Sequence, residues 1–285
     1  MGKQIDTVTI VGVGLISGSF ALGLKDHGLV KHVIGVSRTK ASGDKALELG
    51  IVDEVLPLEE AVRRSDLIYV AIPVDATVPV MQQIMDLITD DQIVADAGST
   101  KKVLCEALEH HPMRHRFVAT HPMWGTEYSG PEAAVRNAFQ GRSCVICEKE
   151  KTDAEAVAAI EKIYEVLGMR LVYMKADDHD MHAAYVSHIS HITSFALANT
   201  VLEKEREENA IFELAGGGFE STVRLAKSNP GMWAPIFMQN RENVLDVLNE
   251  HISQLRKFKA CLEKENYDYL WELMEQANKI KRIIK

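Results

Sequence analysis

Hydrophobic residues follow two different patterns along the chain. In the first part, short apolar runs alternate with amphipathic segments. The apolar runs predict strands at Thr7–Val11, His32–Val36, Asp53–Val55, Leu67–Ile72, Gln92–Asp96, Arg116–Thr120, Ser143–Ile146 and Arg170–Tyr173. The amphipathic segments predict helices at Ile16–His27, Ala41–Gly50, Val78–Leu87, Lys101–His110 and Ala154–Leu167. This alternation is typical of an α/β fold, here a Rossmann-type, mainly parallel sheet with helices on both faces.

After about Ala176 the strand pattern stops, and the rest of the chain is helical in period. It predicts helices at Asp178–Glu205, Glu208–Leu214, Glu220–Lys227, Gly231–Lys264 and Tyr267–Ile284. Because 285 residues exceed the usual size of one compact core, we expect two domains, residues 1–176 and residues 177–285. The second domain is predicted to be all-α.

Charge and hydropathy narrow the choice of partners. The formal net charge of −9 argues against a nucleic-acid partner, and it repels anionic ligands unless cationic side chains gather locally. The apolar runs, such as Asp66–Val74, are shorter than the roughly 20 residues that span a bilayer. Met1–Asp6 leads directly into a strand rather than forming a signal peptide. We therefore expect a cytoplasmic protein without a membrane partner.

A glycine-rich turn follows the first strand and opens a helix, which is the context of a dinucleotide-binding site. Gly12 permits the tight turn, and Gly14 lets the backbone approach a pyrophosphate at the helix N-terminus. The third glycine of the usual pattern is displaced to Gly18, with Ser17 in its place. The expected cofactor contacts are Gly12, Gly14, Leu15, Ile16, Ser37, Arg38, Thr39, Ile72 and Pro73.

The end of the second strand favours NADP over NAD. An acidic residue that binds the ribose 2′-hydroxyl of NAD is expected there, but the sequence has Ser37, Arg38, Thr39 and Lys40 instead. Hydroxyl, guanidinium and ammonium groups suit the 2′-phosphate of NADP. We predict NADP as the preferred cofactor, with NAD possible and a solvated loop as the alternative interpretation.

Polar clusters follow two strands whose carboxyl ends meet at one edge of the sheet. They are Asp96–Lys101 and Thr120–Gly130. A dehydrogenase needs a base that takes a hydroxyl proton as hydride leaves, and histidine has a suitable pKa near neutrality. His121 is therefore the candidate base.

Two clusters have residue types found in metal sites. Cys144 and Cys147 lie three positions apart in a predicted strand, so their side chains face opposite sides, and we interpret them as structural. Four histidines lie within Asp178–Thr193, but at about 100° per residue one straight helix does not gather them around an ion. We predict no metal.

The same helical geometry divides the four histidines. His188 and His191 lie about 60° apart and form a polar stripe with Ser187, which we expect to face a substrate. His179 and His182 lie on the opposite side and are expected to be solvated. Arg224, after the triple glycine Gly216–Gly218, is the best candidate for binding a substrate carboxylate bidentately, with a surface ion pair as the alternative.

Taken together, these segments resemble the prephenate/arogenate dehydrogenase family of tyrosine biosynthesis over essentially the whole chain. The resemblance is carried by Gly12–Ser19, Asp96–Lys101, Thr120–Gly130, His179–His191 and Ala215–Trp233. It implies oxidative decarboxylation of prephenate to 4-hydroxyphenylpyruvate, or of arogenate to tyrosine, with reduction of NAD(P)+. It also implies a homodimer formed by the helical domain.

The resemblance implies roles for individual residues. His121 would accept the proton of the ring hydroxyl, and Ser99 would orient this base and the cofactor. The implied substrate-binding residues are Arg224, His191, His188, Ser187, Thr126, Glu127 and Trp233. The chain departs from the family pattern at Ile189-Ser190, Asn229 and Ala234-Pro235.

Two other classes of protein fit parts of the sequence. An NADP-dependent imine or pyrroline-carboxylate reductase shares the glycine turn and the Ser-Arg-Thr loop, but it does not need His121, Ser99 and Arg224 together. A dinucleotide-sensing protein without catalysis would bind the cofactor and show no turnover.

Overall fold

The computed structural model describes residues 5–208 and 211–283 and separates into two compact units, Met1–Asn240 and Arg241–Lys285. Parts of the predicted segments Met1–Asp6, Glu208–Leu214 and Tyr267–Ile284 lie outside the described residues. The domain division after residue 176 remains a prediction. Within the described ranges, no helix combines the length and the apolar character needed to cross a membrane.

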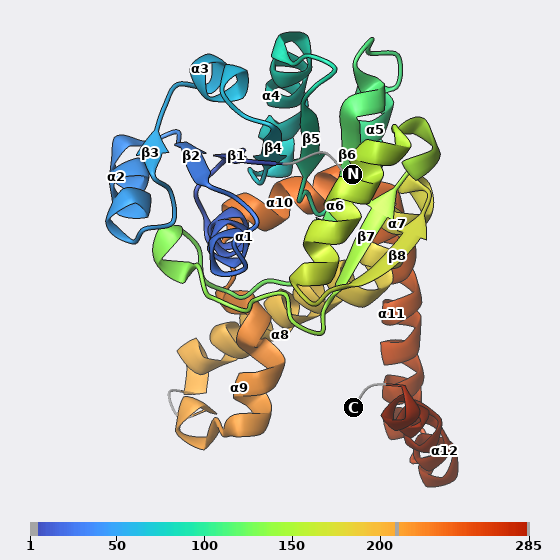
Figure 1. Ribbon diagram of the computed structural model, residues 1–285. Coiled ribbons are helices and arrows are strands. Elements are labelled where there is room, and N and C mark those ends of the chain that lie inside the picture. The colour runs from blue at the N-terminus through green and yellow to red at the C-terminus, as the bar shows by residue number, and fades with distance from the viewer. Residues whose placement is uncertain (1–4, 209–210, 284–285) are drawn as a thin grey trace. The chain divides into compact units, whose positions relative to one another are not determined.

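The first unit contains an eight-stranded sheet in the order β3-β2-β1-β4-β5-β6-β7-β8 (Figure 1). The strands are β1 Thr7–Val11, β2 His32–Val36, β3 Glu54–Val55, β4 Leu67–Val70, β5 Ile93–Asp96, β6 Phe117–Pro122, β7 Ser143–Cys147 and β8 Arg170–Met174. All neighbouring pairs are parallel except β6 and β7. The predicted Rossmann-type, mainly parallel sheet is confirmed.

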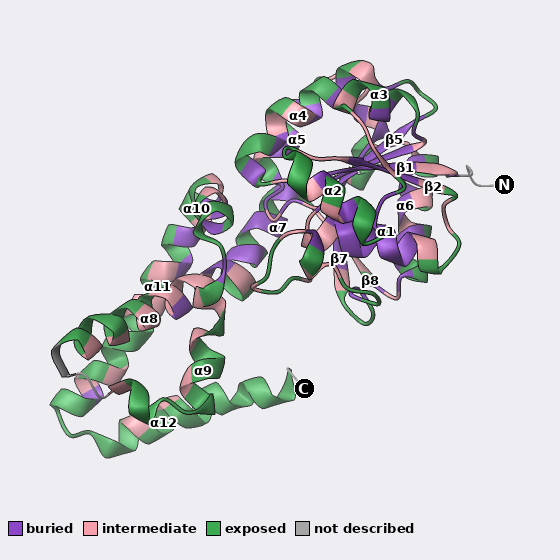
Figure 2. Ribbon diagram, turned by 90° about the vertical axis from the view of Figure 1, so that its left-hand side faces the viewer, coloured by how far each residue is buried: buried purple, intermediate pink, exposed green. Residues whose placement is uncertain are grey.

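Helices cover both faces of this sheet. They are α1 Leu15–Asp26, α2 Lys40–Glu48, α3 Leu58–Arg63, α4 Val74–Leu87, α5 Lys102–Leu108 and α6 Ala154–Val166. One apolar cluster joins one face of the strands to α1 and α6, and a second joins the other face to α4 and α5. Figure 2 shows the central strands β1, β4 and β5 and the inward sides of these helices as largely buried.

The alternation of side chains along β7 confirms the interpretation of its cysteines. Cys144 belongs to the first apolar cluster and Cys147 to the second. Their sulfurs therefore lie on opposite faces of the sheet and do not form a pair.

The predicted boundaries of α4 and β6 were wrong. α4 begins at Val74, a turn before the predicted Val78, so that Pro79 lies inside the helix. Proline cannot donate to the carbonyl of Asp75, but both residues are exposed, so water can satisfy that carbonyl. β6 continues past the predicted Thr120 because His121 and Pro122 pair with the antiparallel strand β7.

The first unit also contains helices from the second half of the chain. They are α7 Ala176–Ala183, a π-helical turn Ala184–His188, α8 Ile189–Glu208, a 3-10 turn Ile211–Leu214, α9 Gly217–Val223, a 3-10 turn Arg224–Lys227 and α10 Pro230–Gln239. The predicted single helix Gly231–Lys264 was wrong. It is broken at Asn240, which leaves the helical conformation while its buried side-chain amide donates to the Asp180 carbonyl at 2.6 Å.

The second unit consists of α11 Arg241–Glu263, α12 Tyr267–Ala277 and a 3-10 turn Asn278–Arg282. The side chain of Asn266 caps α12 by accepting from the Tyr269 N–H at 3.1 Å. The buried apolar residues of this second unit are Val244, Val247 and Cys261, whereas many of its larger apolar side chains are exposed.

Gly12→Ala is expected to lower the free energy of unfolding more than Gly28→Ala. Both glycines have positive φ, 86° and 62°, which costs a residue with a Cβ about 1–2 kcal/mol. A Cβ at Gly12 would also lie 2.5 Å from the Ala71 carbonyl oxygen, whereas a Cβ at Gly28 meets nothing within 4 Å. We expect the difference to be about 1 kcal/mol or more, measured by urea unfolding. Equal losses would show that the Gly12 contact carries no cost.

Candidate active site

The glycine turn is held against the ends of two neighbouring strands. The Gly12 N–H donates to the Val36 carbonyl at 2.9 Å, and a Cβ at Gly12 would lie 2.9 Å from Ile72 Cγ2. Gly14 is the N-cap of α1, and a Cβ there would meet nothing within 4 Å. The backbone before Leu15 and Ile16 is therefore open to a phosphate group, as a dinucleotide requires.

The displaced third glycine, Gly18, lies against the loop that follows β6. Ser17 is buried, and its hydroxyl donates to the Gly12 carbonyl. A Cβ at Gly18 would lie 2.8 Å from the Ala134 side chain. Gly18 thus lets the loop after β6 pack on α1.

The loop after β2 leaves one guanidinium available. The Ser37 hydroxyl donates to the Thr39 carbonyl at 3.0 Å, and Thr39 caps α2 by accepting from the Ser42 N–H at 3.3 Å. Lys40 pairs with Asp44 at 2.6 Å. Arg38 is exposed and makes no ion pair within the described part of the chain. Pro73 is exposed at the N-cap of α4.

His121, at the end of β6, bonds to another histidine. Its Nδ1 lies 2.8 Å from Nε2 of His179, and Nδ1 of His179 lies 2.7 Å from Oδ1 of Asp180. His179 and Asp180 are each 2% exposed. The expectation that His179 is solvated was therefore wrong, whereas His182 is exposed as expected.

The π-helical turn explains this error. In a straight α-helix at about 100° per residue, His179 and His188 would lie about 180° apart. A π-turn accommodates one additional residue and so removes about 100° of rotation from everything that follows it. The turn at Ala184–His188 brings His188 to within about 80°, and His191 to within about 20°, of His179.

Backbone and side-chain bonds fix the surroundings of His121. Asp180 accepts from the N–H groups of Lys101 and Lys102 at 2.7 and 3.0 Å. The buried Lys101 ammonium pairs with Asp96 and donates to the Thr120 carbonyl at 2.7 Å. Ser99 lies in the same loop and is half-buried, and no hydrogen bond joins it to His121 in the described residues.

The second group of candidate residues surrounds Trp233. The rings of His191 and Trp233 are stacked with centroids 3.4 Å apart, and His188 meets Trp233 edge-on at 6.1 Å. His191 Nδ1 lies 3.1 Å from the carbonyl of the half-buried Ser187. His188 Nδ1 lies 3.1 Å from the Asn240 side-chain nitrogen.

Arg224 forms an ion pair in this structure. Its Nη1 lies 3.1 Å from Oε2 of Glu127, and its side chain is 50% exposed. The segment that carries Arg224 is tied to α8 by the buried Ser194, whose hydroxyl donates to the Thr222 carbonyl and accepts from the Ala226 N–H. Thr126 is exposed beside Glu127.

Burial makes the imidazoles poor cations. Burial, with the nearby His179 and the Lys101 charge, holds the pKa of His121 well below the ordinary 6.5. Burial is also the main cause that lowers the pKa of His188 to about 4 and the pKa of His191 below its ordinary value. These rings are suited to accept protons and hydrogen bonds at neutral pH.

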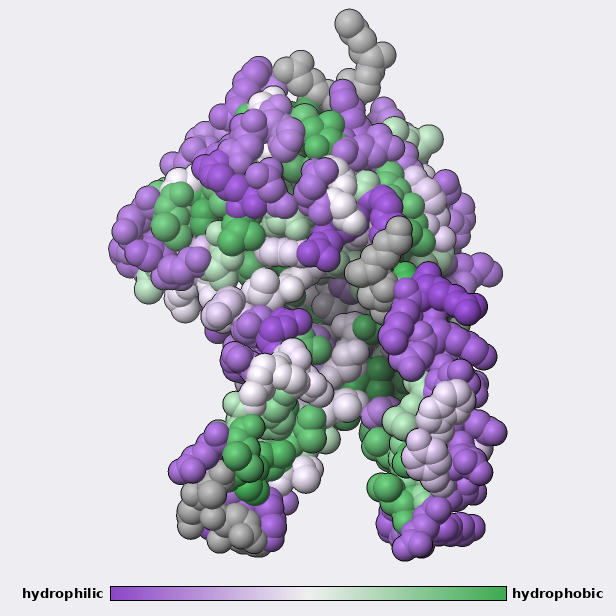
Figure 3. All heavy atoms as spheres, turned by 90° about the horizontal axis from the view of Figure 1, so that it is seen from below, coloured by the Kyte–Doolittle hydropathy of each residue, from purple (hydrophilic) through white to green (hydrophobic). Residues whose placement is uncertain are grey.

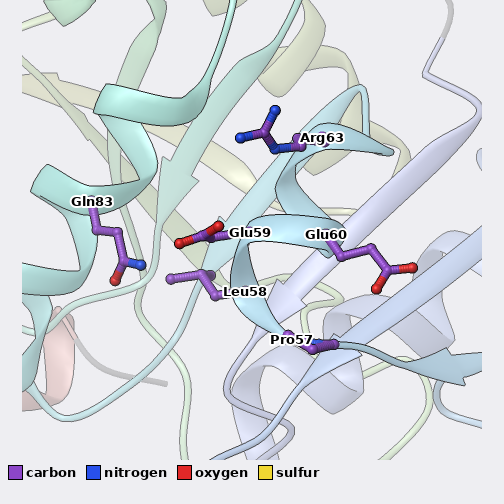
Figure 4. Close-up of a pocket in the computed structure, with 6 residues that line it drawn as sticks. All are labelled: Pro57, Leu58, Glu59, Glu60, Arg63 and Gln83. Carbon is purple, nitrogen blue, oxygen red and sulfur yellow. The ribbon is translucent and has the colours of Figure 1, made fainter.

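Two other features do not belong to this cluster. A hollow of about 650 Å³ is lined by Pro57, Leu58, Glu59, Glu60, Arg63 and Gln83 (Figure 4). Its two carboxylates against one guanidinium make it unsuitable for a phosphate, and it shares no residue with the histidines. The described residues contain no group of three or more His, Cys, Asp or Glu side chains that could hold a metal ion.

Several residues of the cluster escaped the sequence analysis, namely His179 as a contact of His121, Asp180, Asn240 and Ser194. The adjacent His-Asp pair at positions 179 and 180 was a usable signal. No local sequence pattern indicated the roles of Asn240 and Ser194, because their contacts depend on helices far apart in sequence.

The site combines a glycine turn, a neutral histidine at the end of a strand in the same sheet, and cationic or polar groups on packed helices. This combination is that of a nicotinamide-dependent oxidoreductase. Residues 20–173 match the family model "Prephenate dehydrogenase, nucleotide-binding domain", and residues 175–276 match "Prephenate dehydrogenase, dimerization domain". The chain belongs to the prephenate dehydrogenase family. It is therefore a dehydrogenase with a nicotinamide cofactor, and the resemblance identified in the sequence is confirmed.

Individual relatives agree with this assignment. The chain is 30% identical to a prephenate dehydrogenase of Bacillus subtilis, covering 97% of this chain and 76% of that protein. It is also 30% identical to a cyclohexadienyl dehydrogenase of Zymomonas mobilis, with coverage of 98% and 96%. The crystal structure of prephenate dehydrogenase from Aquifex aeolicus, in complex with hydroxyphenyl propionate and NAD+, matches with a TM-score of 0.89 and 32% identity over 98% of this chain and 97% of that one.

We expect His121 to remain neutral at pH values well below 6.5. The burial of its ring disfavours the imidazolium, and protonation should therefore require more acid than it does for an ordinary histidine. An NMR titration of the His121 ring, assigned with the His121→Asn variant, measures the midpoint. A midpoint at or above 6.5 would contradict the inferred environment.

Proposed function

We propose that this protein converts prephenate to 4-hydroxyphenylpyruvate with reduction of NAD(P)+ and release of CO2, as a step of tyrosine biosynthesis. The observation that carries the proposal is His121, a half-buried base whose strand ends at the same sheet edge as the glycine turn. The family membership gives this base its reaction.

The proposed reaction consists of hydride transfer, proton transfer and decarboxylation. A nicotinamide bound at the glycine turn of Gly12 and Gly14 would supply the acceptor for the hydride of the ring carbon. His121 accepts the proton of the hydroxyl on that carbon. Loss of CO2 then makes the ring aromatic, and the ring oxygen regains a proton as a phenol. Because aromatisation drives decarboxylation, the protein chiefly positions the ring and removes one proton.

The residues around Trp233 are proposed to bind the substrate, which is a dianion. Prephenate carries two carboxylates, and a chain with a net charge of −9 must gather cations locally to bind it. We assign the carboxylates to Arg224 and to His191, whose imidazole the negative charge of the substrate would favour in its protonated form, with Ser187, His188, Thr126, Glu127 and Trp233 lining the substrate. Arg224 has five N–H donors, so it can keep its contact with Glu127 and still bind a carboxylate. Ser99 is assigned to orient His121 and the cofactor.

Arogenate is the alternative substrate. It differs from prephenate in carrying an amino group instead of the side-chain keto group, and both contain the cyclohexadienyl ring after which the Zymomonas mobilis relative is named. The ratio of kcat/KM for the two substrates distinguishes these possibilities.

NADP is the proposed preferred cofactor because of Arg38. The hydroxyls of Ser37 and Thr39 are engaged in local turns and Lys40 in an ion pair, which leaves the Arg38 guanidinium to meet a 2′-phosphate. Gly12, Gly14, Leu15, Ile16, Ile72 and Pro73 would surround the rest of the dinucleotide.

We further propose a homodimer formed through the helical part of the chain. Residues 175–276 match a dimerisation domain. The unit of α11 and α12 exposes large apolar side chains that include Leu255, Leu262, Tyr267, Trp271 and Met274, and Figure 3 shows hydrophobic surface on it. Burial of these side chains by a second copy would remove them from water.

With prephenate and NADP+, the protein is expected to produce reduced cofactor, followed by its absorbance. His121→Asn should lower kcat by roughly 10²-fold or more, because the proton loses its acceptor. His182→Asn replaces an exposed histidine and should leave kcat unchanged. Absence of turnover in the wild type would favour a sensing protein, and oxidation of NADPH with cyclic imines but no turnover of prephenate would favour a reductase.

Arg38→Ala should reduce the preference for NADP+ over NAD+ by about 10-fold or more, because one charge-assisted contact to the 2′-phosphate is lost. The measurement is the ratio of kcat/KM for the two cofactors. Lys45→Ala is the matched control, since Lys45 is a cation of α2, the helix that follows this loop, and pairs with Glu48. An unchanged ratio in Arg38→Ala would remove Arg38 from cofactor selection.

A further inference from the structure

We propose that Asp180 and His179 act as positioning residues that hold His121 in one tautomer, with its Nδ1 protonated and its Nε2 free to accept the substrate proton. This inference rests on the proposed function only for the proton that His121 receives. The order of donors and acceptors comes from the hydrogen bonds of the three side chains.

The order begins at Asp180. Its Oδ1 receives the Lys101 N–H and its Oδ2 receives the Lys102 N–H, so the carboxylate acts as an acceptor. Nδ1 of His179, 2.7 Å from Oδ1, must therefore carry a hydrogen. A neutral imidazole has one N–H, which leaves Nε2 of His179 as an acceptor.

The position of the hydrogen on His121 follows from the acceptor on His179. Its Nδ1 lies 2.8 Å from the accepting Nε2 of His179, so this Nδ1 must be the donor. Nε2 of His121 is then unprotonated. An aspartate fixes the tautomer of the base histidine in serine proteases by the same logic, there with one histidine instead of two.

The chain of bonds is anchored at its far end. Besides the two N–H groups on its carboxylate, Asp180 has its carbonyl bonded to the Asn240 amide at 2.6 Å. His179 is buried between Asp180 and His121 and has no room to exchange partners with water. After His121 takes the substrate proton, its Nδ1–H can keep the same bond to His179, so proton transfer requires no rearrangement of the protein.

The experiment combines three variants with a matched control. Asp180→Asn places an amide that can donate to His179 Nδ1 and so reverses the chain of bonds, putting the hydrogen of His121 on Nε2. His179→Gln keeps an acceptor oxygen close to the position of Nε2, whereas His179→Leu provides none. His182→Gln changes an exposed histidine of the same helix.

The first readout is the tautomer of His121, measured by ¹⁵N–¹H correlation of the imidazole nitrogens in the full-length protein. The wild type, His182→Gln and His179→Gln should carry the hydrogen on Nδ1, and Asp180→Asn should carry it on Nε2. A wild-type hydrogen on Nε2 overturns the proposal. This readout does not depend on turnover, so a failure of the proposed function would be recognised separately.

The second readout is kcat with prephenate at saturating cofactor. Asp180→Asn and His179→Leu should lose about 10²-fold or more in kcat with little change in KM, since a positioned base contributes roughly 10²–10⁴-fold. His179→Gln should retain most of the wild-type kcat. If His179→Leu matches the wild type, or if His179→Gln falls as far as His179→Leu, the acceptor on residue 179 does not position the base and the proposal is wrong.

Discussion

The buried ion pair between Asp96 and Lys101 holds together the edge of the sheet on which the site is built. Both side chains are fully buried, and their charges are compensated by hydrogen bonds to the backbone of Thr120 and Gly98. β5 and β6 share only two paired positions, so these contacts do much to join the two strands where they end. These contacts fix the backbone of Thr120, which directly precedes His121. They also fix Lys101, whose N–H donates to Asp180.

The sheet was predictable because its physics is local. Each strand of the sheet except the two-residue β3 contains a short apolar run, and the glycine turn marks where the first run ends. The helix α3 was missed, since six residues show too little of a helical period. The inclusion of His121 in β6 depends on antiparallel pairing with β7, 22 or more residues further along the chain, which no local pattern reports.

The site was predictable in its residue types and less so in their partners. His121 was identified by its place at a strand end, and Arg224 by its guanidinium. The ion pair of Arg224 with Glu127, and the bond of His121 to His179, join segments 97 and 58 residues apart. Such contacts follow from tertiary packing, and a uniform helical period placed His179 on the wrong side.

Because of the π-turn at Ala184–His188, the relative orientation of the histidines depends on the number of residues in this segment as well as on their identity. A regular α-helix of the same length would keep every histidine in the sequence but would turn those after the turn about 100° away from their present direction, whereas a regular helix one residue shorter would keep that direction. The loss of one residue within the turn is therefore a milder change to the orientation of these rings than substitutions that convert the turn to a regular α-helix of the same length. The angle between His179 and His191 around the helix axis is therefore set by the number of residues between them and by the type of helix, in addition to the side chains themselves.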